Sequence, residues 1–516
     1  MSATPHIDRL LHHVRARPDA LAFSVGDAHL TFGDLGDRAR RWAGALQGLG
    51  VAPGDRVACV LGTSLDLIEV VLGAYLAGAI HVPVNTRYGA LEVEHILRDS
   101  GATILLTEHD APARGFAAAL IDGLPLERVV VRGGDLGLEA HESSLDALRV
   151  TATPTQGPPP VCDDDPALFI YTSGTTGRSK GVVHTYASIV AAIGALTDLW
   201  RFSPDDDLVL ALPLFHVHGL GIGVHGTLIQ GNRALLHARF DPAAVADEVA
   251  DGATVFMGVP TMYHRIVAAI DADPSLGDAL SGARLFTSGS AALSADLFAR
   301  FEAHTGHRIL ERYGMSETML TLSNPYEPEA RRPGTIGFPI AGVEARVVTE
   351  EGVVVTEPGE VGELQVRGAT MMREYWWAPE RTAESFDGGW FRTGDVVTRD
   401  ADGYVSHRGR ASVDILKCGG YKLSAREIEE VIARHPDVEE VAVLGAPDEE
   451  WGQRIVAAVV AREGARERDL GAWLEALRER VAQELAPYKR PSQVVVLDEI
   501  PRNALGKVQK HRIEVP

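Results

Sequence analysis

The stretch Tyr171-Thr-Ser-Gly-Thr-Thr-Gly-Arg-Ser-Lys180-Gly181 lies between two apolar runs, Ala167–Ile170 and the run that starts at Val182-Val183. Both runs are typical of buried strands. Its glycines allow tight backbone turns, its hydroxyl side chains offer donors, and Lys180 adds a positive charge. Loops of this composition bind polyphosphate oxygens through N–H and O–H groups. The stretch therefore predicts a phosphate-binding loop between two strands.

Two other interpretations of the stretch are less favoured. A flexible Gly/Ser/Thr linker has this composition too, but such a linker rarely lies between two apolar strands and ends in Lys-Gly. A Walker A loop requires Gly-Lys-Ser/Thr, whereas Lys180 is followed by Gly181.

The composition limits the classes of function. The chain has 516 residues, 45% hydrophobic and 23% charged, which is ordinary for a globular protein of two or more domains. Its net charge of −22 argues against a nucleic-acid surface and means that an anion site must carry its own Lys and Arg. Three scattered cysteines, no signal-like N-terminus and no apolar stretch of membrane-spanning length predict a cytoplasmic protein without a membrane span.

The order of the elements predicts an α/β fold. Short apolar runs such as Arg56–Leu61, Ile80–Val84 and Leu208–Leu212 alternate with helical patterns, which favours layered α/β subdomains with a mostly parallel sheet. From about Pro333, Gly, Pro and β-rich runs predict a small β-barrel. We expect a large N-terminal domain over residues 1–409 and a smaller, mobile C-terminal α+β domain over residues 410–516.

Further motifs accompany the phosphate loop. They are Pro213-Leu-Phe-His-Val-His-Gly219, Ser288-Gly-Ser-Ala291, Glu311-Arg-Tyr-Gly-Met-Ser-Glu-Thr318, Trp390-Phe-Arg-Thr-Gly-Asp395, Asp414-Ile-Leu-Lys-Cys-Gly-Gly420 and Pro501-Arg-Asn-Ala-Leu-Gly-Lys507. Taken together with the loop, they resemble the acyl-adenylate-forming enzymes over nearly the whole chain. The chain departs from that family at Ser179, where Pro is usual, and at Ser316 and Asn503, where Thr is usual.

The resemblance implies an ATP site with Mg²⁺. Tyr313 would stack on adenine, Ser316 would donate to the α-phosphate, and Glu317 would hold Mg²⁺, which prefers carboxylate and phosphate oxygens. Asp395 would accept hydrogen bonds from the ribose hydroxyls, and Arg410 would contact ribose or phosphate. The remaining expected ATP-binding residues are Thr172, Ser173, Gly174, Thr175, Thr176, Gly177, Lys180, Ser288, Gly289, Ser290 and Glu311.

The resemblance also implies two half-reactions served by one mobile domain. Lys507 would stabilise the charge that develops at phosphorus during adenylation. After a hinge rotation near Gly409–Asp414, Lys417 with Gly419 and Gly420 would face the thiol of CoA. His216 would occupy the gate between the acyl pocket and the thiol path.

The acid substrate is predicted from two arginines. The residue before the adenine-stacking Tyr is commonly small or apolar in this family, but here it is Arg312. Arg265 lies at the start of a helix expected beside the same pocket, and His218 lies in the gate motif. Arginine suits bidentate capture of a carboxylate, so these residues would hold the distal carboxylate of a short dicarboxylate. Arg284 is a weaker candidate, because Arg is common there across the family, and Arg265 or Arg312 could instead form an internal salt bridge.

The segments around these residues resemble the malonyl-CoA synthetases. The resemblance implies a ligase that converts malonate, and also methylmalonate, with ATP and CoA into an acyl-CoA, AMP and pyrophosphate. Three further hypotheses stay open: an acyl-CoA synthetase for another short acid, an adenylation enzyme that loads a carrier protein, and a nucleotide-binding protein without catalysis. The sequence leaves the oligomeric state open.

Overall fold

A computed structural model describes most of the chain in two compact units. It describes residues 5–115, 126–133, 138–156, 161–172, 179–410, 414–418, 421–448, 452–465, 469–485, 489–502 and 508–515. The first unit comprises residues 1–333, 337–344 and 367–391, and the second comprises residues 334–336, 345–366 and 392–516. The second unit thus gathers the strands before residue 409 with the C-terminal part of the chain. The pivot expected within Gly409–Asp414 stays a prediction, because residues 411–413 lie outside the described part.

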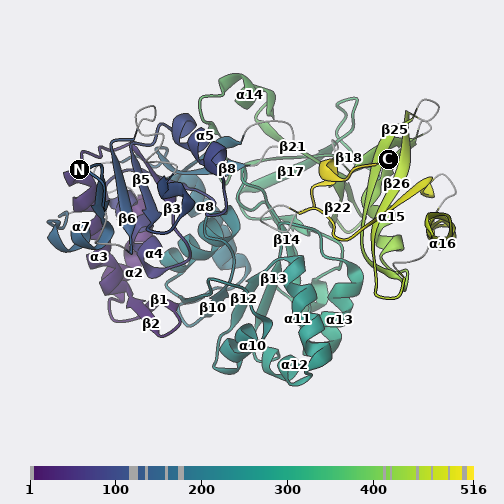
Figure 1. The fold of residues 1–516 in the computed structure, drawn as a ribbon, viewed down its shortest axis with the longest axis horizontal. Helices are drawn as coiled ribbons and strands as arrows, with labels where there is room; N and C mark the ends of the chain where they lie inside the picture. Colours follow the sequence, from purple (N-terminus) through teal and green to yellow (C-terminus); the bar gives the residue numbers. More distant parts are fainter. Residues whose placement is uncertain are drawn as a thin grey trace. The chain divides into compact units, whose positions relative to one another are not determined.

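The first unit contains a nine-stranded sheet that is parallel over its centre (Figure 1). Its spatial order is β16 (Phe338–Pro339), β15 (Leu322–Ser323), β14 (Leu310–Tyr313), β13 (Leu285–Ser288), β12 (Val255–Gly258), β10 (Asp207–Leu210), β11 (Arg233–Leu236), β1 (Leu21–Val25) and β2 (Ala28–Thr31). The middle strands are short apolar runs, as parallel strands covered on both faces require. The structure confirms the predicted mostly parallel α/β arrangement.

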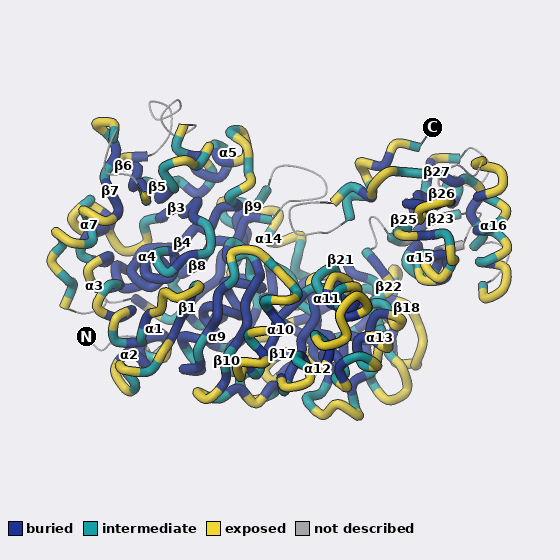
Figure 2. Tube along the Cα trace, turned by 60° about the horizontal axis from the view of Figure 1, so that its bottom comes forward, coloured by how far each residue is buried: buried dark blue, intermediate teal, exposed yellow. Residues whose placement is uncertain are grey.

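Helices α10 to α13 cover one face of this sheet. They are α10 (Pro242–Ala250), α11 (Pro260–Ala272), α12 (Ser275–Leu280) and α13 (Ala295–Thr305). Phe256 of β12 and Phe286 of β13 form one hydrophobic core with Tyr263 of α11 and Phe301 of α13. Figure 2 shows these strands as buried and the outer sides of the helices as more exposed. Because helices cover this face of the sheet, polar loops can be placed only at the ends of its strands.

The first unit also contains an eight-stranded sheet. Its order is β19 (Glu374–Tyr375), β9 (Lys180–Thr185), β8 (Pro166–Thr172), β4 (Ile80–Pro83), β3 (Arg56–Val60), β5 (Ile104–Glu108), β6 (Arg128–Arg132) and β7 (Glu142–Ser144). Helix α5 (Ala90–Ser100) packs its apolar side on this sheet through Val93, Ile96 and Leu97. Strands β8 and β9 are the two apolar runs predicted around the phosphate loop, and they pair antiparallel.

The other helical elements of the first unit connect these sheets. They are α1 (Pro5–Leu10), α2 (His12–Ala16), α3 (Phe32–Gly48), α4 (Leu65–Leu76), α7 (Leu145–Thr151), α8 (Tyr186–Leu199), π-helix η2 (Val217–Val224), α9 (His225–Gln230), 3₁₀ turn η3 (Pro328–Ala330) and α14 (Pro379–Glu384). Local sequence sets their ends. Helix α3, for example, begins at a capping box in which the Thr31 hydroxyl accepts from the Asp34 N–H and Asp34 accepts from the Thr31 N–H.

The second unit holds strands from the Gly/Pro-rich stretch and the C-terminal elements. A five-stranded sheet, corresponding to the predicted small barrel, contains β17 (Val343–Val348), β18 (Val361–Gly368), β21 (Trp390–Arg399), β20 (Phe386–Asp387) and β22 (Val405–Arg410), and most of it belongs to this unit. The C-terminal elements are β23 (Ile415–Cys418), β24 (Tyr421–Ser424), α15 (Ala425–Ile432), β25 (Val438–Asp448), β26 (Gly452–Ala461), α16 (Leu470–Ala482), β27 (Gln493–Leu497) and η5 (Lys510–Arg512). Their apolar side chains form a separate core around Trp473 and Ile428.

Candidate active site

The ends of the phosphate loop are held by paired strands. Thr172 lies opposite Lys180, and Tyr171 lies opposite Gly181, in the antiparallel pair β8–β9. Ser173, Gly174, Thr175, Thr176 and Gly177 lie outside the described residues. The structure therefore places the first and last predicted phosphate-binding residues side by side, at the same end of the strand pair.

Lys180 and Glu317 both lie close to Tyr375. The Tyr375 hydroxyl donates to Glu317 Oε1 at 2.8 Å, and Lys180 Nζ lies 5.6 Å from the centre of the Tyr375 ring. Burial and the charge of Arg381 lower the pKa of Lys180, while the charge of Glu317 opposes this shift. Tyr375 belongs to β19, which pairs with β9, so the sheet brings Tyr375 close to Lys180, and the Tyr375 hydroxyl connects Glu317 to them.

The loop that carries Ser316 and Glu317 is also fixed through its backbone. His184 Nε2 lies 2.6 Å from the Ser316 carbonyl oxygen, and the Met372 N–H donates to the Glu317 carbonyl at 2.7 Å. Gly314 is needed before this loop, because an added Cβ would lie 2.0 Å from the Met319 carbonyl oxygen. Met319 has a φ of 55°, a conformation that costs energy for a non-glycine residue.

Glu317 is a suitable ligand for Mg²⁺. Its carboxylate is a hard oxygen donor, and the residue is only 8% exposed. Among the residues that the structure describes, no group of three or more His, Cys, Asp and Glu side chains could hold a metal ion. Mg²⁺ is commonly bound by one or two carboxylates together with substrate phosphates, and Glu317 could supply one of them.

The predicted adenine and acyl wall lies at the ends of β13 and β14. Ser288 pairs with Glu311 across these parallel strands, and Tyr313 ends β14. Gly289 lies against Arg312, since an added Cβ would come within 2.6 Å of the guanidinium carbon. Ser290 has a φ of 68°, and its hydroxyl lies 3.3 Å from His218 Nδ1.

Arg312 is a buried charge without a counterion on the described residues. It is 3% exposed, and its Nε and Nη2 nitrogens have no hydrogen-bond partner among the described residues. Burial lowers the pKa of Arg312 to about 9. A guanidinium buried in this way is costly unless something external compensates it. Its two unpartnered nitrogens could donate to an anion supplied from outside the chain.

His218 lies near this arginine, and His216 lies near His218. Burial lowers the pKa of His216 to about 4. Burial and the charge of Arg312 lower the pKa of His218 well below its usual range, so both imidazoles are neutral at neutral pH. His218 Nε2 is buried without a partner among the described residues. A neutral imidazole can still donate a hydrogen bond to an anion that Arg312 binds.

A π-helix presents His218. The segment Val217–Val224 forms this rare turn, which occurs often at functional sites. Gly219 lets it approach the preceding segment closely, because a Cβ there would lie 2.4 Å from the Pro213 carbonyl oxygen.

Arg265 lies on the exposed side of α11, where Nη2 donates to the Phe240 carbonyl at 3.3 Å and the guanidinium lies 4.8 Å from the centre of the Phe240 ring. The buried face of α11 is formed by Tyr263, Ile266 and Val267, and Arg265 lies outside that face. Of the three expected carboxylate-binding residues, Arg312 and His218 are close enough for the Arg312 charge to act on the imidazole. The expected role of Arg265 stays a prediction.

Asp395 and Arg410 are adjacent within the second unit. Asp395 on β21 pairs with Arg410 on β22, and Arg410 Nε donates to Asp395 Oδ1 at 2.9 Å. His407 Nε2 lies 3.4 Å from the same oxygen. The structure thus brings together the two residues expected at the ribose.

The residues expected to alternate between half-reactions are only partly described. The backbone of Lys417 pairs with Lys422 in the β23–β24 hairpin. Its side chain, Gly419, Gly420 and Lys507 lie outside the described residues, so their roles stay predictions. Arg502 and Val508, on either side of the Lys507 segment, form a β-bridge.

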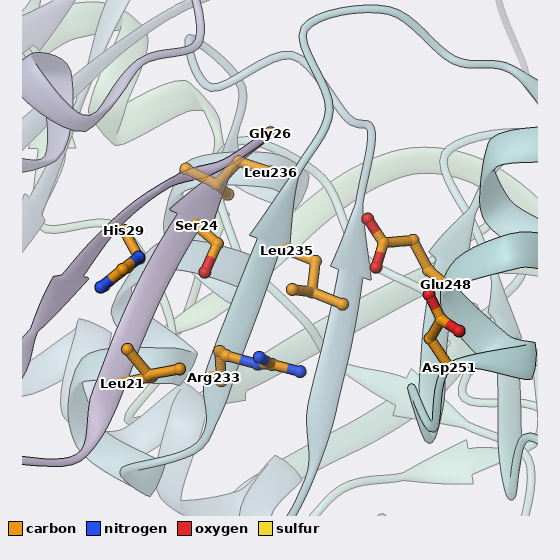
Figure 3. A pocket seen from close by; sticks show the side chains of 9 residues that line it. All are labelled: Leu21, Ser24, Gly26, His29, Arg233, Leu235, Leu236, Glu248 and Asp251. Carbon is orange, nitrogen blue, oxygen red and sulfur yellow. The ribbon is translucent and has the colours of Figure 1, made fainter.

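A cavity of about 370 Å³ lies away from these motifs (Figure 3). Its lining comes from the β1–β2 hairpin, β11, α10 and the residue that follows α10: Leu21, Ser24, Gly26, His29, Arg233, Leu235, Leu236, Glu248 and Asp251. Arg233 pairs with Asp207, and Glu248 pairs with His237. None of the predicted site residues lines this cavity.

Motif reasoning missed Tyr375 and His184, which hold the Glu317 loop. Tyr375 lies in Glu374-Tyr-Trp-Trp377, an aromatic cluster that could have drawn attention, and His184 lies four residues after Lys180. Neither position shows from sequence that it reaches residues 316 and 317.

Comparisons with known proteins agree with this fold. The AMP-binding enzyme family matches residues 10–376, and the AMP-binding enzyme C-terminal domain matches residues 427–507. A malonate–CoA ligase of Arabidopsis thaliana is 36% identical, over 91% of this chain and 79% of its own length. A sulfoacetate–CoA ligase of Cupriavidus necator is 36% identical, over 96% of this chain and 94% of its own. The crystal structure of ATP-bound MatB from Rhodopseudomonas palustris is similar with a TM-score of 0.89 and 34% identity, over 98% of this chain and 97% of that one.

The fold and the motifs define an adenylate-forming enzyme with a large N-terminal and a smaller C-terminal domain. The chain belongs to the AMP-binding enzyme family, and it is an ATP-dependent acyl-CoA ligase that acts through an acyl-adenylate. Among the described residues, no helix combines the length and apolar composition needed to cross a membrane.

Proposed function

We propose that this ligase activates malonate, and also methylmalonate, and transfers the acyl group to CoA. The observation that carries the proposal is Arg312, a buried guanidinium with two nitrogens unpartnered among the described residues. One carboxylate of malonate reacts with ATP, and the other pairs with Arg312 and accepts from His218. A monocarboxylate of the same size would leave Arg312 buried and uncompensated, so it would be a poor substrate.

The other residues divide between binding and chemistry. Thr172 to Gly177 and Lys180 bind the phosphates, Ser288 to Ser290, Glu311 and Tyr313 surround adenine, and Asp395 with Arg410 binds ribose. Glu317 holds Mg²⁺, which neutralises phosphate charge when it is bound. Ser316 donates to the α-phosphate, and Lys507 supports adenylation by stabilising charge at phosphorus. Lys417, Gly419 and Gly420 then face CoA, and His216 separates the acyl pocket from the thiol.

A second candidate substrate class is a short sulfonated acid. A sulfonate is also an anion, and two of its three oxygens can accept the paired N–H groups of a guanidinium. The similarity to a sulfoacetate–CoA ligase favours this class as the second candidate.

The test is a screen of acids read as acyl-CoA by mass. Malonate, methylmalonate, sulfoacetate, acetate, butyrate, benzoate and a long fatty acid are each supplied with ATP, Mg²⁺ and CoA. The proposal expects malonyl-CoA and methylmalonyl-CoA as the main products, with acetate and fatty acids poor. A preference for butyrate or benzoate would refute it, and a preference for sulfoacetate would support the second candidate.

A further inference from the structure

Tyr375 links two residues of the proposed nucleotide site that come from different parts of the chain. Its hydroxyl donates to Glu317 Oε1 at 2.8 Å, and its ring lies under Lys180 with Nζ 5.6 Å from the ring centre. Both Tyr375 and Glu317 are almost fully buried, at 7% and 8% exposure. In such surroundings a hydrogen bond to a charged group is stronger than at the surface.

The backbone makes the same connection. Strand β19 pairs with β9 through Tyr375↔Val182, two residues after Lys180. The Met372 N–H, just before β19, donates to the Glu317 carbonyl at 2.7 Å. The segment of residues 372–375 therefore holds the Glu317 backbone, the Glu317 side chain and the strand that begins at Lys180.

The hydroxyl is the donor in this contact, because an ionised carboxylate only accepts hydrogen bonds. The 2.8 Å hydrogen bond holds Oε1 of Glu317 in one position. A carboxylate fixed through one oxygen loses less freedom when its other oxygen binds a cation.

We propose that Tyr375 is a positioning residue for Mg·ATP: its hydroxyl orients the Glu317 carboxylate, and its ring places the Lys180 ammonium. The proposal rests on the roles given above to Glu317 and Lys180. The two parts of Tyr375 act separately, so the hydroxyl serves metal-dependent binding and the ring serves phosphate binding with or without metal.

Two substitutions separate these parts in the full-length enzyme. Tyr375→Phe removes the hydroxyl and keeps the ring, whereas Tyr375→Leu removes both. Binding of a non-hydrolysable ATP analogue is measured by calorimetry, with Mg²⁺ and with EDTA. We expect Tyr375→Phe to weaken binding with Mg²⁺ about tenfold, the value of one hydrogen bond to a charged group, and to leave binding in EDTA unchanged. Tyr375→Leu should weaken binding under both conditions, and the KM for the acid should stay unchanged in both variants.

Tyr75→Phe is a matched control, because it removes another buried phenol, which lies 2.8 Å from His225 Nε2. It should lower the melting temperature without changing either affinity. If Tyr375→Phe lowers the melting temperature and leaves the Mg²⁺-dependent affinity at the wild-type value, Tyr375 is only structural and the proposal is overturned.

Glu317→Gln separates this proposal from the one on which it rests. A Glu317→Gln enzyme that binds the analogue with Mg²⁺ as tightly as wild type would overturn the role of Glu317, and with it that of Tyr375. Loss of Mg²⁺-dependent affinity in Glu317→Gln together with normal affinity in Tyr375→Phe would overturn the role of Tyr375 alone.

Discussion

Arg284 directly precedes β13, and Arg312 lies on the neighbouring strand β14. The charge of Arg284 is paired with an acid, whereas that of Arg312 has no counterion among the described residues. The Arg284 side chain keeps 26% exposure, yet Nε and Nη2 donate to the two Asp206 oxygens at 2.7 Å each. Arg312 is 3% exposed, and two of its nitrogens have no partner among the described residues. The more deeply buried charge is thus the less compensated one, which is the reverse of what stability alone would favour.

The pKa values express the same difference. Burial disfavours the Arg284 cation, but the hydrogen bonds and charge of Asp206 outweigh it and raise the pKa of Arg284. Burial alone lowers the pKa of Arg312 to about 9. Arg284 is paired with an acid of the same chain, whereas Arg312, by our proposal, pairs with an acid that arrives with the substrate.

The largest expected effect is on malonate turnover by Arg312→Met. Truncating one partner of a buried charge pair costs about 2–5 kcal/mol, so kcat/KM for malonate should fall roughly 30- to 5,000-fold. Arg265→Ala tests whether Arg265 holds the acid together with Arg312, as the sequence predicted, or whether Arg312 holds it without Arg265. A normal rate in Arg265→Ala supports a site built on Arg312, whereas a loss as large as that of Arg312→Met would show that both arginines hold the acid.

Arg284→Met should reduce stability. It leaves Asp206, 4% exposed, without the guanidinium that pairs with it. We expect the free energy of unfolding to fall by about 3 kcal/mol, measured by urea denaturation without substrate. An unchanged unfolding midpoint would mean that the Arg284–Asp206 ion pair contributes nothing to stability. Arg284 could then no longer serve as the example of an arginine that stabilises the fold.

Arg312→Met, unlike Arg284→Met, should not destabilise the substrate-free protein. A methionine fills similar volume without a buried charge, so stability should stay the same or rise by about 1–4 kcal/mol. Urea denaturation in the absence of any acid is again the measurement. A loss of stability like that of Arg284→Met would indicate that Arg312 has a partner within the protein.

Much of the site could be predicted from sequence, because its motifs are local. The strands around the phosphate loop, the pairing of Asp395 with Arg410 and the burial of Arg312 and His218 follow from short stretches. The expectation that Arg265 lies beside the acyl pocket does not use helix phase, and that role stays a prediction. The spacing of Tyr263, Ile266, Val267 and Ile270 marks the buried face of α11, and Arg265 falls outside it.

Other features depend on contacts between distant segments. Tyr375 reaches Glu317 across 58 residues of sequence, and His184 reaches Ser316 across 132. The π-helix at Val217–Val224 depends on glycines packing against Pro213 and Leu210, which no local periodicity reveals. Such tertiary contacts decide where the side chains point, and single-sequence patterns do not contain them.

The most direct test of the central claim compares malonate with 3-methylbutanoate, an acid in which two methyl groups replace the two distal oxygens. The shapes are alike and the distal charge is absent, so the ratio of their kcat/KM values reports what Arg312 recognises. We predict that the wild-type enzyme prefers malonate by at least about a hundredfold and that Arg312→Met abolishes or reverses this preference. A wild-type enzyme that uses the two acids equally well, or an Arg312→Met enzyme that keeps the preference, would contradict the account.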